Sequence, residues 1–252
     1  MSVRLPEETQ AEPTEPRSDV AYWANGSSRL HVENPPAGAI NLNVEGRLLA
    51  GPIQGFGKMW QKTYRVRLEG VSASPTDVIA TWKARFPEFW PPGNRFYAPL
   101  TGIAPGEVAL LNLTMPGRQK LSTGVLVLYA DEESFTLMTP EGHMLAGWIT
   151  FSAHEQAGTT VAQAQVLIRA SDPIYELGLT TFGHRKEDQF WCHTLAHLAL
   201  HFGIVATPEA NTVCIDNRRQ WRRFGNVRHN AAIRTGLHSA TTPLRWFRRR
   251  GA

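Results

Sequence analysis

Cysteine and long apolar runs are scarce in this sequence. Its 252 residues contain only Cys192 and Cys214, in no metal-binding or redox spacing, which argues against a disulfide framework and indicates a reducing compartment. No stretch approaches the roughly 18–20 uninterrupted apolar residues of a membrane span, and residues 1–19 lack the apolar segment of a secretory signal. We therefore expect a cytoplasmic protein, peripheral at most to a membrane or a large complex, with one main core.

Complete catalytic motifs are missing as well. The three glycines of residues 51–57 do not have the G-x-G-x-x-G spacing of a dinucleotide-binding turn, and no strand-turn-helix unit surrounds them. Ser122, Ser134 and Ser152 lack the sharp turn that exposes a serine nucleophile, and neither cysteine has a histidine that the sequence can place beside it. We predict no cofactor and no nucleophilic catalysis.

The sequence also contains no complete set of metal ligands. His193, His197 and His201 repeat every four residues in a predicted helix over residues 186–203, so they share one face. Two histidines at this spacing can hold zinc when a further ligand is present. No glutamate follows His193 in the H-E-x-x-H pattern, and the histidine face lies off the apolar stripe of the helix. We predict that this face binds no structural metal.

Acidic residues are absent after Asp216, whereas ten arginines and no lysine follow it. The whole chain has a formal charge of +4, so removing these ten charges leaves −6 on residues 1–216. Arginine suits phosphate and carboxylate groups, and interleaved aromatic residues suit an interface. We expect an extended strap that meets an acidic protein or an anionic membrane surface, with nucleic acid and the chain's own acidic body as alternatives. The predicted anchoring residues are Arg218, Arg219, Trp221, Arg222, Arg223, Trp246, Arg248, Arg249 and Arg250.

Strand signals dominate the middle of the chain. Residues 121–170 contain four runs rich in β-branched and aromatic residues, separated by turn-forming clusters, which predicts an antiparallel meander. In the third run Trp148 shares one face with polar side chains, opposite Ile149 and Phe151. Polar groups also alternate along residues 161–170. We expect such groups to line an enclosed or half-enclosed cavity.

Further elements precede and follow this meander. Residues 39–51 alternate like a strand, and in residues 63–68 the side chains of Tyr64 and Val66 are expected to oppose Lys62. The sequence Ser-Pro-Thr-Asp at residues 74–77 predicts the start of a helix, which a proline-broken aromatic segment ends. The predicted remaining elements are strands over residues 95–101 and 107–115 and a long helix over residues 186–203, whose apolar stripe packs on the sheet.

The fold class that follows is α+β, an antiparallel sheet of about six or seven strands gripping a long C-terminal helix. We expect three parts: an extended N-terminal arm over residues 1–38, a domain over residues 39–205 and a basic tail over residues 206–252. Tyr22, Trp23 and Leu30 are candidates for docking the arm on a partner or on the domain itself.

This element order resembles the START-like helix-grip superfamily, also called SRPBCC, which includes polyketide cyclase-like and lipid-transfer-like proteins and many uncharacterised bacterial ones. The resemblance covers about residues 62–203 and rests on the broken helical pair at 75–92, the long helix, and the phrases TPEGH at 139–143 and RASDPIYE at 169–176. It implies an apolar cavity between sheet and helix for a lipid, sterol, polyketide or aromatic ligand. The arm and the tail lie outside the resemblance.

Candidate ligand-binding residues follow from this cavity. They are Trp82, Phe89, Trp90, Tyr97, His143, Trp148, Arg169 and Tyr175. Arg169 has two interpretations, an ion pair with Asp172 or Glu176 and a clamp for a ligand carboxylate or phosphate.

We predict a binding module for a hydrophobic or amphipathic small molecule, tethered through its arms to a larger assembly or surface. Two alternatives stay open. One is a scaffold subunit whose pocket is filled. The other is a cyclase, hydrolase or dehydratase that uses His143, titrating near neutral pH, with Glu141 or Asp172.

Overall fold

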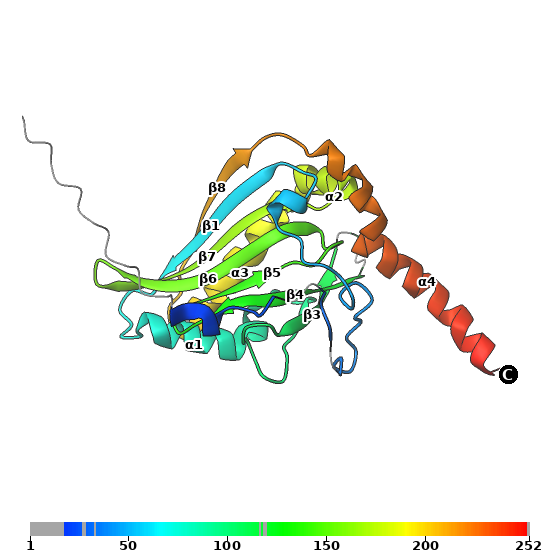
Figure 1. Ribbon diagram of the computed structural model, residues 1–252. Coiled ribbons are helices and arrows are strands. Elements are labelled where there is room, and N and C mark those ends of the chain that lie inside the picture. The colour runs from blue at the N-terminus through cyan, green and yellow to red at the C-terminus, as the bar shows by residue number, and fades with distance from the viewer. Residues whose placement is uncertain (1–17, 27–28, 33, 116, 118–119, 251–252) are drawn as a thin grey trace, which may run out of the picture.

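One antiparallel sheet organises the chain. The computed structural model describes residues 18–26, 29–32, 34–115, 117 and 120–250. The eight strands follow the order β2-β3-β4-β5-β6-β7-β1-β8, and the sheet curves around helix α3, His184–His201 (Figure 1). The strands are β1 Met59–Arg67, β2 Arg95–Tyr97, β3 Val108–Thr114, β4 Lys120–Ala130, β5 Ser134–Met138, β6 Leu145–Gln156, β7 Thr159–Ala170 and β8 Glu209–Asp216.

The predicted fold class is confirmed, including the meander from β4 to β7. The predicted number of strands was too low, because residues 209–216 were assigned to the tail. These residues pair antiparallel with β1 as the edge strand β8. Seven of the eight residues of β8 are exposed, and the apolar alternation in its sequence is limited to Val213 and Ile215, which is too short to predict a strand.

Helix α1, Pro75–Arg85, begins as the sequence predicts. The Ser74 hydroxyl accepts the N–H of Asp77, and the Asp77 carboxylate accepts the N–H of Ser74, which forms a capping box. A 3₁₀ turn, η3 Phe86–Phe89, continues the helix where Pro87 interrupts it. This pair covers one end of the inner face of the sheet.

The long helix is entered through a short helix and a π turn. Asp172 caps α2, Pro173–Gly178, by accepting the N–H groups of Ile174 and Tyr175. The π turn η5, Leu179–Gly183, then leads directly into α3. A π turn inserts one extra residue into a helix, so it changes which α3 side chains face the sheet. The buried stripe of α3 consists of Thr194, Leu195, Leu198 and Ala199, close to the predicted one.

Segments from the N-terminal part cover the outer face of β3 and β4. The strand expected at residues 39–51 is wrong: this segment forms turns, because its backbone closes on itself with bonds such as Val44 N–H to Asn41 O at 2.9 Å. Val44 and Leu30 are buried against the outer side of β3 and β4. Trp23, after the 3₁₀ turn η1 Ser18–Tyr22, bridges Tyr129 with ring centroids 4.8 Å apart. This part of the arm docks on the domain's own surface.

The basic tail is folded after β8, so the expectation of an extended strap is wrong. A 3₁₀ segment, η6 Trp221–His229, precedes helix α4, Ala231–Arg250. The joint to the domain is made by hydrogen bonds, from Gln220 N–H to Phe56 O at 2.7 Å and from Ala231 N–H to Gly142 O at 2.9 Å. Beyond this joint α4 points away from the sheet (Figure 1). The side chains of Trp246, Arg248, Arg249 and Arg250 lie outside the described part of the structure.

Candidate functional site

The space between the sheet and α3 is filled by aromatic side chains. Trp82, Phe86, Phe135 and Phe151 are each 0% exposed, as are Leu195 and Leu198 of α3. The Phe151 ring lies 4.7 Å from the ring of Phe135, measured between centroids, and 5.0 Å from those of Trp82 and Phe86. A side chain with no accessible surface borders no cavity that would hold even a water molecule. The expected enclosed cavity is therefore not found around these residues.

The eight predicted ligand-binding residues do not converge on one site. Trp82, Phe89 and Trp90 belong to the packed inner core. The strand registers put Tyr97, Trp148 and Arg169 on the outer face, because their neighbours Phe96, Ile149 and Ile168 point inward. His143 lies in the turn before β6, and the hydroxyl oxygen of Tyr175 in α2 accepts the N–H of Ala232 at 2.9 Å.

His143 is buried and held by its own turn. Its Nδ1 atom accepts the N–H of Leu145 at 3.0 Å. Burial lowers the pKa of His143 to about 4, against the expectation that it titrates near neutral pH. Glu141 instead contacts Arg47 at 3.6 Å and His229 at 3.3 Å, and Asp172 is occupied by the cap of α2 and by Asn230. The structure therefore does not assemble the acid–base set of His143 with Glu141 or Asp172.

The burial of His143 predicts a pH effect on stability. Between pH 6.5 and about 4 the unfolded chain binds a proton at this position and the folded chain does not, so stability rises with pH across this window. We expect acidification through the window to remove about 2–3 kcal/mol through this group. Urea unfolding of wild type and His143→Asn at pH 7 and pH 4.5 measures the difference. An equal loss in both proteins would show that His143 titrates normally.

Arg169 is a structural clamp whose partners differ from those expected. Its guanidinium donates to the carboxylate of Asp216 and to the carbonyl oxygens of Gly57 and Arg218. The expected ion pair with Asp172 or Glu176 is wrong, because Glu176 pairs with Arg219 at 3.0 Å. The backbone N–H of Arg218 and the guanidinium of Arg169 lower the pKa of Asp216 to about 2. The clamp fixes the end of β8 to β7.

A buried ionic cluster at the start of α3 was missed by the sequence analysis. Lys62 is 0% exposed and lies on the inner face beside Tyr64. Its ammonium group contacts Glu187 Oε2 at 2.9 Å and Asp188 Oδ1 at 2.8 Å, and the hydroxyl of Tyr64 donates to the same Asp188 oxygen at 2.7 Å. Burial raises the pKa of Glu187, although the charge of Lys62 opposes this shift. The cluster joins α3 to β1, and strict alternation from Tyr64 would have placed Lys62 inside.

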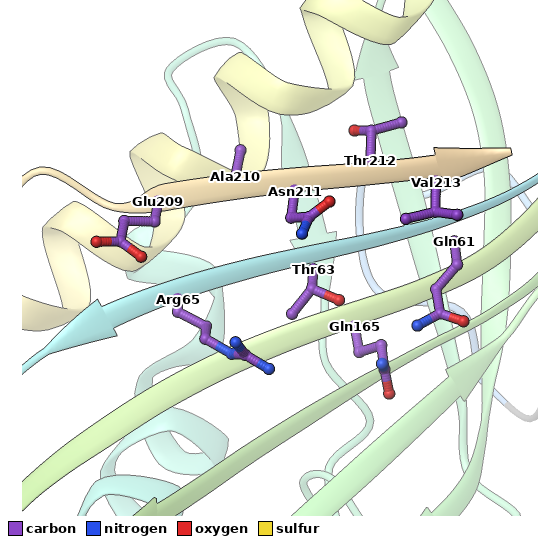
Figure 2. A pocket seen from close by; sticks show the side chains of 9 residues that line it. All are labelled: Gln61, Thr63, Arg65, Gln165, Glu209, Ala210, Asn211, Thr212 and Val213. Atoms are coloured by element: carbon purple, nitrogen blue, oxygen red, sulfur yellow. The ribbon is translucent and has the colours of Figure 1, made fainter. Parts of the chain in front are cut away.

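A shallow polar groove lies on the opposite face of the sheet. Its volume is about 560 Å³, and Figure 2 shows side chains of β7, β1 and β8 along it. The labelled residues are Gln61, Thr63, Arg65, Gln165, Glu209, Ala210, Asn211, Thr212 and Val213. It has no aromatic lining and is open, which is typical of a solvated sheet face rather than of an apolar ligand site.

The histidine stripe of α3 is on the surface. His193 and His197 stack with ring centroids 3.8 Å apart, and His201 Nδ1 lies 3.0 Å from the guanidinium of Arg85. Among the residues that the structure describes, no group of three or more His, Cys, Asp or Glu side chains is arranged to hold a metal ion. No described helix is long and apolar enough to cross a membrane.

Exposed aromatic and basic side chains gather where η6 meets α2 and the 3₁₀ turn η2, Pro52–Gln54. Trp221 is 69% exposed and Phe224 54%, although both rings touch the buried ring of Phe56 at 5.3 and 6.4 Å between centroids. Asn226 ties η6 to both neighbours through the carbonyl oxygens of Gln54 and Ser171, each at 2.8 Å. We call this end the docking surface. It comprises Ile53, Ile174, Leu177, Arg218, Trp221, Arg222 and Phe224, all of them exposed.

The docking surface carries an excess of positive charge. Asp216 is shared by Arg169 and Arg218, and Glu176 pairs with Arg219, so the arginines outnumber these carboxylates. Arg218 is 83% exposed and Arg222 is also exposed. Of the nine predicted anchoring residues, the structure brings together those between 218 and 223.

No protein-family model matches the chain, and no curated protein matches it. Among solved structures it is similar to the di-domain ARO/CYC StfQ from the steffimycin biosynthetic pathway, with 14% identity and a TM-score of 0.46 over 57% of this chain and 50% of that one. A conserved protein from Geobacillus kaustophilus is 8% identical with a TM-score of 0.44, covering 59% and 99%. Ara h 8.0201 is 11% identical with a TM-score of 0.42, covering 57% and 97%. The fold assignment rests on the sheet and helix described above: the chain has the helix-grip architecture that its sequence predicts.

Proposed function

We propose that this protein is a docking module that attaches a filled helix-grip domain to an anionic lipid surface through the docking surface. The observation that carries the proposal is the exposure of Trp221 and Phe224 beside an excess of arginines, since Asp216 is shared by Arg169 and Arg218 and Glu176 pairs with Arg219. Folded proteins rarely leave large aromatic side chains this exposed in a group without a partner.

The chemistry of the docking surface favours a bilayer. Tryptophan and arginine suit the headgroup region, where an apolar ring contacts the acyl boundary and a guanidinium contacts phosphate. An anionic surface attracts each nearby basic residue by roughly 1 kcal/mol. Ile174 and Leu177 add apolar side chains from α2 at the same end of the sheet. The partner that fits these groups therefore has a negatively charged surface layer with an apolar layer beneath it.

The packed inner core supports a scaffold role for the grip itself. Trp82, Phe86 and Phe151 occupy the space where a helix-grip ligand would lie. Binding of a hydrophobic small molecule in this space would require these rings to move, at a cost of several kcal/mol. We therefore place the activity of the protein at its surface, in line with the alternative of a filled pocket.

The test is vesicle binding by a double variant, Trp221→Ala/Phe224→Ala. Full burial of an aromatic side chain contributes about 1.5–3 kcal/mol, so losing two half-inserted rings should weaken binding by about tenfold or more. Co-sedimentation with vesicles of phosphatidylcholine, with and without phosphatidylglycerol, measures the change. Leu200→Ala/Val205→Ala is the matched control, because these residues are exposed but lie at the other end of α3.

Four outcomes decide the proposal. Selective loss in the Trp221/Phe224 variant, on anionic vesicles, supports it. Equal binding of both variants, or no binding of the wild type to either vesicle, contradicts it. Wild-type binding that phosphatidylglycerol does not enhance also contradicts it, because the arginines would then have no role.

A further inference from the structure

A cluster of arginines surrounds one histidine at the joint between η6 and α4. Arg47 Nη1 lies 2.9 Å from His229 Nδ1, and Arg228 Nε lies 2.8 Å from His229 Nε2. Arg234, in the first turn of α4, is held beside them by Asn43 Oδ1 at 2.9 Å and the carbonyl of Leu42 at 3.2 Å. Arg47 from the N-terminal part and two arginines of the tail thus meet around a single imidazole.

These contacts leave a donor without an acceptor. A neutral imidazole has one N–H and one acceptor nitrogen, and a protonated one has no acceptor. His229 can therefore accept from Arg47 or from Arg228, and the other arginine then faces an N–H group. Only Glu141, at 3.3 Å from His229 and 3.6 Å from Arg47, supplies a carboxylate contact here among the described residues.

The cluster also carries more positive than negative charge. Three arginines against one glutamate leave an excess of two positive charges in a partly buried place, where Arg47 is only 12% exposed. Burial lowers the pKa of His229, and the three arginines lower it further while Glu141 opposes them. Burial and Arg47 also lower the pKa of Arg234. Such repulsion is relieved when an anion with several acceptor atoms enters.

The cluster is positioned by close packing rather than by flexible loops. A Cβ atom added to Gly142 would lie 2.1 Å from the carbonyl oxygen of His229, and the φ angle of Gly142 is +87°. A side chain at this position would therefore push η6 away from the turn that carries Glu141. This glycine belongs to the TPEGH phrase of the sequence, so the phrase serves the joint and not a catalytic turn.

We propose that Arg47, Arg228, His229 and Arg234 form a binding site for a phosphate group. Guanidinium groups donate two parallel hydrogen bonds to phosphate, and a phosphate oxygen supplies the acceptor that the second arginine at His229 lacks. The phosphate belongs either to a soluble molecule or to a lipid headgroup. This site uses residues other than those of the docking surface, so it stands without the proposed membrane attachment.

The first experiment titrates inorganic phosphate into the full chain at constant ionic strength, with chloride as the balancing anion, by isothermal calorimetry. Arg228→Gln should weaken binding by about tenfold or more, because it removes one charge-assisted donor pair. Arg228 is exposed and its one described hydrogen bond is to His229, so the fold should persist. Arg65→Gln is the matched control: it removes the same charge from an exposed residue of β1 that belongs to neither the cluster nor the docking surface, and it should change binding less than about twofold.

A second variant gives a change of opposite sign. Glu141→Gln removes the carboxylate that competes with an incoming anion, so phosphate affinity should rise by about threefold or more. A purely structural role of the cluster predicts no gain. Wild-type protein that binds phosphate no better than chloride, equal losses in Arg228→Gln and Arg65→Gln, or no gain in Glu141→Gln would each overturn the proposal.

Vesicles separate the two sources of phosphate. If a lipid headgroup is the ligand, Arg228→Gln weakens binding to vesicles containing phosphatidic acid, and inorganic phosphate competes with them. If a soluble molecule is the ligand, vesicle binding is unchanged in Arg228→Gln while the calorimetric loss remains. In either case Trp221→Ala/Phe224→Ala keeps its affinity for inorganic phosphate, so a failure of the docking surface and a failure of this site give different results.

Discussion

Lys62→Met should lower the free energy of unfolding by about 3–5 kcal/mol, the cost of breaking a buried ion pair by removing one partner. The ammonium group of Lys62 is fully buried and contacts both Glu187 and Asp188. Without it, Glu187 keeps a buried carboxyl group whose only described ion-pair partner is gone. Urea unfolding measured by circular dichroism gives the difference.

A second substitution tests whether charge or packing is responsible. In Lys62→Met/Glu187→Met the buried carboxyl is also removed, so most of the lost stability should return. Asp188 then still accepts from the hydroxyl of Tyr64 and is more exposed than Glu187. Arg65→Met on the outer face of β1 is the control and should change stability by less than about 0.5 kcal/mol. If the double variant is less stable than Lys62→Met, the loss comes from packing.

Phe151→Ala should cost about 3–5 kcal/mol, in the range of large aromatic truncations in a core. The ring of Phe151 contacts those of Phe135, Trp82, Phe86 and Trp191, so its removal opens a hole in the centre of the grip. The neighbouring rings come from β5, α1, η3 and α3 and cannot all close on the gap. Thermal or urea unfolding measures the loss, with Ser152→Ala on the outer face as the control.

The same variant tests whether the grip is filled in the wild type. An apolar hole of this kind binds small apolar guests such as benzene. We expect benzene to raise the melting temperature of Phe151→Ala and to leave that of the wild type unchanged. A loss below about 1 kcal/mol, or an equal effect of benzene on both proteins, would show that the wild-type grip already contains free space.

The sequence predicts most of the fold because its local signals agree with one another. The capping residues Ser74 and Asp77 mark the start of α1, and the alternation over residues 121–170 marks the meander. Where local signals fail, a distant partner decides the structure. β8 forms because β1 offers it hydrogen bonds, although its own side chains remain exposed. The alternation over residues 39–51 reflects burial of Val44 on the sheet and not a strand.

The candidate sites were harder to predict than the fold, because the partners of their residues lie far away in the chain. Polar residues such as Lys62 are assigned to solvent by default, and only a carboxylate pair that is 125 and 126 residues away in the chain makes burial possible. The partner of Arg169 also depends on β8, since Asp216 ends that strand. Trp221 and its arginines were predicted as anchoring residues from composition alone, and their role stays a prediction. A single sequence does not show which of its distant segments contact one another, and these contacts decide where Lys62 and Arg169 find their partners.

The place of β8 in the sheet also bears on synthesis of the chain. β1 is made early and pairs on one side with β7, whereas within the described part of the chain its other edge is covered by β8 alone, which begins 142 residues beyond the end of β1. During translation that edge stays unpaired until residue 216 has left the ribosome. The ion pair between Arg169 and Asp216 cannot form before then either. An unpaired strand edge recruits other strands. A nascent chain that stalls between residues 170 and 216 therefore has β1 paired with β7 but exposes the other edge of β1, and we expect it to aggregate more readily than the complete chain.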